Sequence, residues 1–358
     1  MSSLFGSAAS ASTNPAQGDT KNDVPLKDPP GDSISDIAFS SAADFLAVSS
    51  WDNAVRIYEI DGSGQSQGKA MYKHEGPALS VAWTRSGTKV VSGGADKAAR
   101  MLDLGGNLNA PQQVAAHDQP IKCVKMFTHQ GNDMLITGSW DKTIKYWDLR
   151  SPTAAVSVTL QDRCFTMDVK DNLLVIGTAE RYINIVNLTV PDKFYKTIQS
   201  PLKYQTRVVS CFADSSGFAV GSIEGRCAIQ YVEEKDSSLN FSFKCHRQPD
   251  PNNRDQNKVF SVNAISFHPV HGTFSTAGSD GTFHFWDKDA KHRLKGYPEV
   301  GGQIPATAFS NSGNIFAYAV SYDWSKGYAH HSASAVNKIM LHPVQGDECK
   351  PRPNSKKR

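Results

Sequence analysis

The sequence predicts an all-β protein, folded as a seven-bladed propeller whose last blade is completed by an N-terminal strand. Three observations support this prediction. One pattern recurs seven times between residues 34 and 344, short segments alternate apolar and polar residues, and no long segment shows the 3.6-residue period of a helix.

The recurring pattern is a tight turn with an acidic residue, followed by a strand-like segment. Strong copies begin at Ser50 (SWDNAVRIYEI), Gly94 (GADKAARMLDL), Gly138 (GSWDKTIKYWDL) and Gly278 (GSDGTFHFWDK), and weaker copies begin at Thr178, Ser222 and Ser321. The acidic residues of the seven turns are Asp52, Asp96, Asp141, Glu180, Glu224, Asp280 and Asp323. They recur about every 45 residues, which is the period of WD repeats, each forming one four-stranded blade.

The text around these turns also indicates strands. Residues 121–126 (IKCVKM) and 143–147 (TIKYW) alternate apolar and polar side chains, as half-buried strands do. Residues 134–137 (MLIT) form a short apolar run that is typical of an inner strand. Gly, Ser and Asp separate these segments, as turns require.

The ring must close, because an open sheet edge promotes aggregation. The seventh repeat leaves little sequence for its outer strand, whereas residues 23–27 (DVPLK) precede the first repeat and have no other assignment. We therefore expect this N-terminal segment to complete the last blade.

Composition divides the chain into three regions. Residues 1–21 are a Ser/Ala-rich tail that we expect to be disordered, residues 22–345 form the propeller, and residues 346–358 form a basic tail. The whole chain of 358 residues carries a net charge of +3. This nearly neutral balance excludes wholesale wrapping of nucleic acid, so any such binding must use a local patch.

Cysteine usage and the apolar pattern indicate a nuclear or cytosolic protein. The six cysteines show no C-x-x-C spacing, which favours reduced thiols in the core. No apolar run approaches the ~20 residues of a membrane helix, and the N-terminus lacks the pattern of a secretory signal. We expect no membrane insertion and a protein that is monomeric outside its complexes.

His117, Ser139 and Asp141 contain the residue types of a catalytic triad, but we interpret them as structural. Together with the strand residue Trp147 they would form a buried, hydrogen-bonded brace that stiffens one blade. A nucleophile also needs an oxyanion hole, and nothing in the sequence supplies one. No metal-ligand spacing or phosphate-binding loop occurs either, so the sequence predicts no catalytic residue, no metal and no cofactor.

Two stretches that flank one repeat are candidates for binding. Residues 241–260 (FSFKCHRQPDPNNRDQNKVF) are polar and suggest an inserted surface loop, and residues 284–295 (HFWDKDAKHRLK) are basic. Together they could form one aromatic and basic groove, with aromatic rings for stacking and cations for phosphates or carboxylates. The alternative is that Trp286 is only the strand tryptophan of its blade and that the lysines are merely solvated.

Specific segments of the chain resemble the Rae/Gle-type messenger-RNA export factors of the nuclear pore. The resemblance extends over residues 24–327 and includes PPGDSISDIAFS (29–40) and SPLKYQTR (200–207). Its most specific segments are GSIEGR (221–226), FKCHR (243–247), FHPVHGT (267–273), FWDKDA (285–290) and SYDWSKG (321–327). After residue 327 the text diverges from the family pattern.

The resemblance implies a non-catalytic scaffold that docks a GLEBS hairpin motif of an FG-repeat nucleoporin and supports poly(A) RNA export. It implies a location in the nucleus, at the nuclear pore complex and envelope, with some protein in the cytoplasm. It also implies that a side groove grips acidic partner segments, with nucleic acid, such as single-stranded RNA or an mRNP, competing for it. The groove positions carried over are Arg226, Phe243, Lys244, Trp286, Asp287, Lys288, Lys291 and Arg293, with Arg226 a candidate partner for a GLEBS carboxylate.

Two other functions stay open at this point. Residues 147–150 (WDLR) match a tetrapeptide that some WD proteins present to a ubiquitin-ligase adaptor, so the chain could be a ligase substrate receptor. A mitotic checkpoint adaptor is the other alternative, because the checkpoint proteins of the Bub type share the fold.

Overall fold

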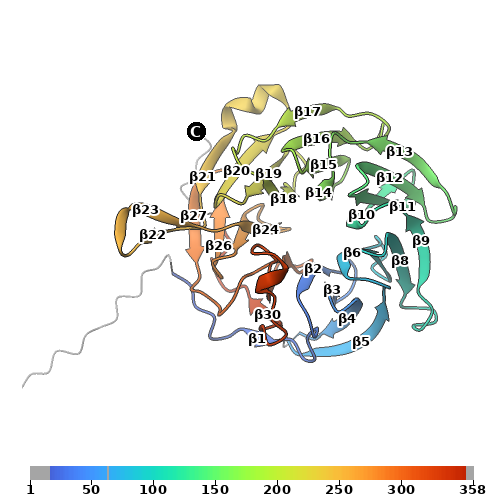
Figure 1. Cartoon of the computed structure of the whole chain (residues 1–358), viewed down its shortest axis with the longest axis horizontal. Helices are drawn as coiled ribbons and strands as arrows, with labels where there is room; N and C mark the ends of the chain where they lie inside the picture. The colour runs from blue at the N-terminus through green and yellow to red at the C-terminus, as the bar shows by residue number, and fades with distance from the viewer. Residues whose placement is uncertain (1–16, 63, 352–358) are drawn as a thin grey trace, which may run out of the picture.

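The computed structural model describes residues 17–62 and 64–351, which form seven four-stranded antiparallel sheets around a common centre (Figure 1). The predicted all-β, seven-bladed propeller is confirmed. Apart from the strands, the described chain contains two short 3₁₀ helices, η1 (Glu234–Leu239) and η2 (Tyr328–His330). Neither of these, nor any other helix in the described residues, is long and apolar enough to cross a membrane.

We number the blades 1 to 7 in the order in which their innermost strands occur in the sequence. Blades 1 to 6 are each built from four strands in sequence order from the centre outward, and blade 7 takes its outer strand from the N-terminal segment. The innermost strands are β2 (Ile34–Phe39), β6 (Ala78–Trp83), β10 (Ile121–His129), β14 (Cys164–Lys170), β18 (Thr206–Cys211), β24 (Val262–Phe267) and β28 (Thr307–Phe309). The second strands are β3 (Phe45–Ser50), β7 (Lys89–Gly94), β11 (Asn132–Ser139), β15 (Leu173–Thr178), β19 (Gly217–Ser222), β25 (Phe274–Gly278) and β29 (Ile315–Val320).

The third and fourth strands complete the blades toward the rim. The third strands are β4 (Ala54–Ile60), β8 (Ala98–Asp103), β12 (Thr143–Asp148), β16 (Tyr182–Asn187), β20 (Arg226–Tyr231), β26 (Phe283–Asp287) and β30 (Lys338–Pro343). The outer strands are β5 (Ser66–Lys73), β9 (Gln112–Ala116), β13 (Ala154–Thr159), β17 (Lys196–Gln199), β21 (Phe241–Lys244), β27 (His292–Gly296) and, in blade 7, β1 (Val24–Pro25).

Burial follows these positions. The second strand of a blade lies between two other strands and between two neighbouring blades, so β15 (LLVIGT) is buried at all six residues. The outer strand β21 instead alternates half-buried Phe241 and Phe243 with exposed Ser242 and Lys244. The apolar core therefore consists of clusters between facing sheets, and the outer strands present alternate side chains to solvent.

The predicted surface loop over residues 241–260 is wrong at its start. Residues 241–244 form β21, and only the following residues make an excursion, as the hairpin β22 (Arg247–Asp250) and β23 (Asn253–Val259). The reason is the alternation of Phe241 and Phe243, which pack against blade 5 and blade 6. In Figure 1 the hairpin projects beyond the ring, next to the label of β27.

The loops lie on two faces of the ring. The turns between second and third strands open on one side, which we call the upper face, and the loops between first and second strands open on the other. In the upper turns that carry an aspartate, its carboxylate accepts the backbone N–H two residues later, as from Ala54 to Asp52 (3.0 Å) and from Thr143 to Asp141 (2.9 Å). These aspartates therefore fix turns, as their period suggests.

The N-terminal strand closes the ring as predicted. β1 pairs with β30, with Val24 opposite Leu341 and Pro25 opposite Met340, and the Leu26 N–H donates to the Ile339 carbonyl (2.8 Å). The Leu26 side chain is 4% exposed and packs in the cluster between blades 7 and 1.

Both ends of the described chain contact the propeller near this closure. His342 on β30 lies between two carboxylates, with Nδ1 2.6 Å from Asp23 and Nε2 3.2 Å from Glu348. The Gly18 N–H donates to the Gly296 carbonyl (2.9 Å), and Cys349 is buried. Residues 17–21 and 346–351, which we assigned to the two tails, thus lie against blades 6 and 7, and the remainder of each predicted tail falls outside the described residues.

Replacing the buried leucine tests the closure. We expect Leu26→Ala to lower the free energy of unfolding by about 2–5 kcal/mol, because the cavity lies where the two ends of the chain meet. Urea unfolding measures this change, and Lys27→Ala, at an exposed neighbouring position, is the control. Equal unfolding free energies for the two variants would contradict closure by this segment.

His342 makes the closure sensitive to pH. Burial opposes its charge, but hydrogen bonds with Asp23 and Glu348 outweigh burial and raise its pKa from 6.5 to about 9. Because the folded-state pKa is raised, the stabilisation is complete below about pH 6.5 and is lost as pH rises through about 9.

Between pH 6.5 and 9.5 the wild type should therefore lose on the order of 2–3 kcal/mol more unfolding free energy than His342→Gln, measured by urea unfolding. If the unfolding free energies of the two proteins changed with pH in parallel, His342 would not stabilise the fold through its positive charge.

Candidate partner-binding surface

The predicted groove lies between β21 of blade 5 and the β26–β27 hairpin of blade 6. Phe243 and Trp286 meet across the blade boundary, with ring centroids 4.5 Å apart, and both are half-buried. Phe241 stacks beside Phe243 at 6.0 Å. Three aromatic rings from two blades thus form one continuous, partly exposed strip.

Trp286 also has a structural role. Its indole N–H donates to Thr276 Oγ1 (2.9 Å), which lies 3.0 Å from Nε2 of His246. Nδ1 of His246 lies 2.9 Å from Asp280, the acidic residue of the upper turn. Trp286 is therefore the strand tryptophan of blade 6, as our alternative held, and only the surface of its ring is left for a partner.

Three of the cations predicted for the groove are exposed. Lys291 places Nζ 5.0 Å from the centroid of the Phe241 ring, Arg293 is opposite Trp286 in the β26–β27 register, and Lys244 ends β21. Within the described chain none of the three makes an ion pair. Their charges are uncompensated and available to an acidic ligand.

Two other predicted groove residues point inward instead. Lys288 is only 8% exposed, and its ammonium lies 2.9 Å from Asp289 and 5.1 Å from the centroid of the Phe212 ring. Burial opposes its charge, but the hydrogen bond with Asp289 raises the pKa of Lys288. Asp287 is 3% exposed and accepts the N–H groups of Asp289 and Ala290, so it fixes the turn.

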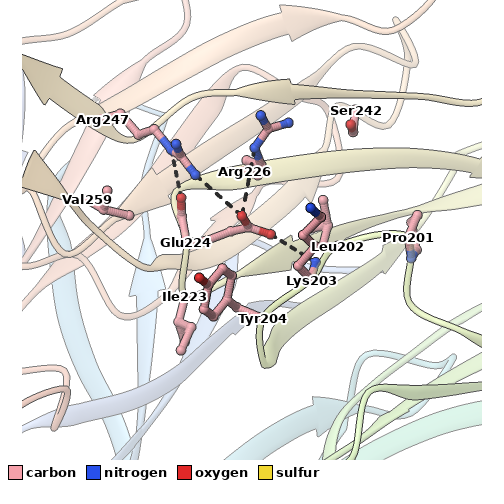
Figure 2. A pocket seen from close by; sticks show the side chains of 10 residues that line it. All are labelled: Pro201, Leu202, Lys203, Tyr204, Ile223, Glu224, Arg226, Ser242, Arg247 and Val259. Carbon is pink, nitrogen blue, oxygen red and sulfur yellow. Dashed lines mark hydrogen bonds and ion pairs between the residues drawn. The ribbon is translucent and has the colours of Figure 1, made fainter. Parts of the chain in front are cut away.

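Arg226, at the start of β20, lies in a pocket of about 780 Å³ on the upper face (Figure 2). Tyr204, Ile223 and Val259 line this pocket with exposed apolar surface. Arg226 is directly opposite Lys244 in the β20–β21 register, so both side chains lie on the same face of the sheet. Side chains alternate along β21, so Lys244 and Arg226 lie on the face of the sheet opposite to Phe241 and Phe243. The pocket and the groove therefore lie on the two faces of the blade 5 sheet.

Local backbone geometry positions Arg226. Gly225 precedes it with φ +65°, and a Cβ at Gly225 would lie 2.3 Å from the carbonyl oxygen of His246. Only glycine allows the turn to approach the beginning of the hairpin this closely. The same approach brings Arg247, the first residue of β22, next to Glu224 of the turn.

The brace of blade 3 differs from our prediction in one residue. His117 Nδ1 lies 2.7 Å from Asp141, but Nε2 contacts Thr137 Oγ1 (2.7 Å), which also accepts the indole N–H of Trp147 (2.8 Å). Ser139 forms a hydrogen bond with neither His117 nor Trp147; its hydroxyl donates to the Gln119 carbonyl (3.0 Å) and accepts the Asp141 N–H (3.1 Å), so it supports the backbone of the turn. Thr137 is the linking hydroxyl because it faces the histidine from the middle of β11.

The contacts of Ser139 and His117 also bear on whether these residues could act as a catalytic pair. No hydrogen bond joins Ser139 to His117, so the described residues hold no serine that this histidine could activate. No group of three or more metal-ligating side chains occurs in the described part of the chain. The surface offers charge, aromatic rings and apolar side chains, which are the elements of a binding site.

Comparison with known proteins decides the family. The chain is 65% identical to the mRNA export factor GLE2 of Chaetomium thermophilum over the full length of both, and 56% identical to the Poly(A)+ RNA export protein of Schizosaccharomyces pombe over 98% of this chain and 99% of that one. It is 43% identical to the Protein Rae1 of Drosophila melanogaster over 98% of this chain and all of that protein. The chain belongs to the Rae1/Gle2 family of mRNA export factors.

Repeat and structure comparisons agree with the fold. Residues 25–59, 65–103, 110–148 and 255–287 match the WD domain, G-beta repeat. The WD40 propeller domain of Doa1 superimposes with a TM-score of 0.69 over 91% of this chain and 97% of that one, at 17% identity. That likeness shows the propeller fold alone.

Several residues of this Rae1/Gle2-family surface were missed in our sequence analysis. Glu224 and Arg247 meet Arg226 in the pocket, and Tyr204 forms its apolar wall. Glu224 and Arg247 stand within the family-like segments GSIEGR and FKCHR, and Tyr204 within SPLKYQTR, so the signal was present. The contacts themselves join three separate loops, so they could not be inferred from the sequence of any one segment.

The corrected brace can be tested by removing its hydroxyl. We expect Thr137→Val to lower the free energy of unfolding by about 1–3 kcal/mol, because His117 and Trp147 each keep a buried nitrogen without a partner. Ser139→Ala removes a hydroxyl in the same strand without touching either ring, and it should cost less. If the two variants lost equal amounts of unfolding free energy in urea, Thr137 would not be the more important hydroxyl of the brace.

Proposed function

We propose that this protein is a non-catalytic WD-repeat scaffold that supports poly(A) mRNA export at the nuclear pore by binding a GLEBS-type hairpin of an FG-repeat nucleoporin. The names of its relatives support an export role. The nucleus and nuclear envelope, with some protein in the cytoplasm, follow as the proposed location.

The observation that carries the proposal is a set of accessible cations beside apolar and aromatic surface. Arg226 lies in the upper pocket with Lys244 opposite it, and Lys291 and Arg293 lie in the groove. An acidic hairpin could place a carboxylate at Arg226 and apolar side chains on Tyr204. A charge-assisted hydrogen bond in a partly desolvated site contributes about 1.5–3 kcal/mol.

The groove and the pocket serve two parts of this function. The pocket combines one accessible guanidinium with apolar walls, which suits a folded peptide hairpin. The groove combines Lys291 and Arg293 with the half-buried rings of Phe241 and Phe243, which suits an extended acidic segment or a single RNA strand that contacts the rings. Acidic protein and RNA would then compete for the groove but not for the pocket.

A pull-down with an immobilised GLEBS-type hairpin peptide tests this proposal. We expect the wild type to bind, Arg226→Glu to lose at least tenfold in affinity, and Lys291→Glu/Arg293→Glu to lose less, because the groove is the second contact. Lys288 is left unchanged because its ammonium is buried and its reversal would disturb the fold. Lys193→Glu/Lys196→Glu, two exposed lysines at the rim of blade 4, is the matched control.

The outcomes separate the sites. Loss of binding in Arg226→Glu alone assigns the hairpin to the pocket, and loss in the groove variant alone assigns it to the groove. Wild-type binding that survives both changes rejects this surface, and absence of wild-type binding rejects the nucleoporin function.

A further inference from the structure

Glu224 is the acidic residue among those that line the upper pocket, and its side chain is 10% exposed. It stands in the turn between β19 and β20, at the position that carries the repeated carboxylate in every blade. Figure 2 shows it between the two guanidinium groups of Arg226 and Arg247. A negative charge thus already lies where the proposed partner would bring one.

Comparison with other blades shows that Glu224 is only partly committed to its turn. Asp52 and Asp141 each accept one N–H from the loop before their blade and a second from the residue two positions later. Glu224 keeps the first of these bonds, because Oε1 accepts the Lys203 N–H (3.1 Å). Its longer side chain turns the other oxygen, Oε2, toward the arginines instead.

The two arginines are held differently. Arg247 donates from Nε to the Glu224 backbone carbonyl (2.8 Å) and from Nη2 to Oε2 (3.4 Å). Arg226 approaches Oε2 only to 3.8 Å through Nε, which is too long for a hydrogen bond. Arg247 is therefore anchored by the main chain, whereas Arg226 is restrained by charge alone and can turn to another carboxylate.

We infer that Glu224 is an internal competitor that lowers the affinity of the pocket for partner carboxylates. Its charge offsets that of Arg226 and repels an incoming carboxylate at the same position. An acidic side chain alone then gains little, and a partner must also cover the apolar side chains of Tyr204, Ile223 and Val259. Glu224 thus selects an acidic peptide with adjacent apolar residues over acidic chains in general, an inference that rests on the function proposed above.

Glu224→Gln tests this directly, because glutamine keeps the side-chain length and an acceptor for Lys203 but removes the charge. We expect the GLEBS-type hairpin to bind this variant about three- to tenfold more tightly than the wild type by titration calorimetry. The gain should shrink as NaCl rises from about 0.05 M to about 0.5 M, because salt screens the repulsion. Glu75→Gln, which removes a charge from an 87% exposed side chain elsewhere on the upper face, should change nothing.

A second variant ties the effect to Arg226. In the Arg226→Gln background, replacing Glu224 with glutamine should no longer raise the affinity, since the charge for which it competes is gone. Equal or weaker binding by Glu224→Gln, or a gain that persists without Arg226, would overturn the inference. Absence of binding by the wild type and by every variant would instead reject the nucleoporin function, and thermal unfolding of each variant confirms that it is folded.

Discussion

The pairing of the first strand with the last blade is the contact on which the whole ring depends. Without β1 the sheet of blade 7 would hold three strands and β30 would lack its outer partner. Here β1 adds to β30, and Leu26 fills the core between blades 7 and 1. His342 joins the segment before β1 to the segment after β30, because it contacts both Asp23 and Glu348. Once the ring is closed, every blade is held by two neighbours, and the loops of the upper face keep fixed positions.

Buried hydrogen-bonded braces hold strand side chains of several blades in place. Blades 3 and 6 each contain a buried hydroxyl, Thr137 or Thr276, that links a histidine to a strand tryptophan. In blade 2 the hydroxyl of Ser92 links His74 to Tyr72 instead. All three blades place a hydroxyl of the second strand at the centre of these hydrogen bonds. In blade 6 the bond from Trp286 to Thr276 holds the indole ring beside Phe243.

Much of this architecture could be predicted from residues that repeat. The turn carboxylates, their spacing and the unassigned residues 23–27 predict the number of blades and the closure, because these features depend on local turn and strand chemistry. Family-like segments point to the residues of pocket and groove. The comparisons then give the family itself.

The remaining details depend on contacts between segments that are far apart in the sequence. Lys288 looks like a surface cation in its own segment, but Phe212 and Tyr231 of the neighbouring blade cover it. Thr137 and Ser139 stand two residues apart on the same side of β11, so the sequence does not show which hydroxyl reaches His117. In the structure Thr137 does, and Ser139 donates to the Gln119 carbonyl instead. From the sequence, Glu224 is one more turn carboxylate. Its contact with Arg247 depends on the position of the β22–β23 hairpin, which the sequence does not give.

The position of β1 also sets the order in which the molecule can be assembled. Its partner, β30, lies near the other end of the chain, so Val24 and Leu26 leave the ribosome long before residues 339–341 exist. During synthesis the first strand made is therefore the last to be placed, and the apolar Leu26 stays open to other chains until the seventh blade is complete.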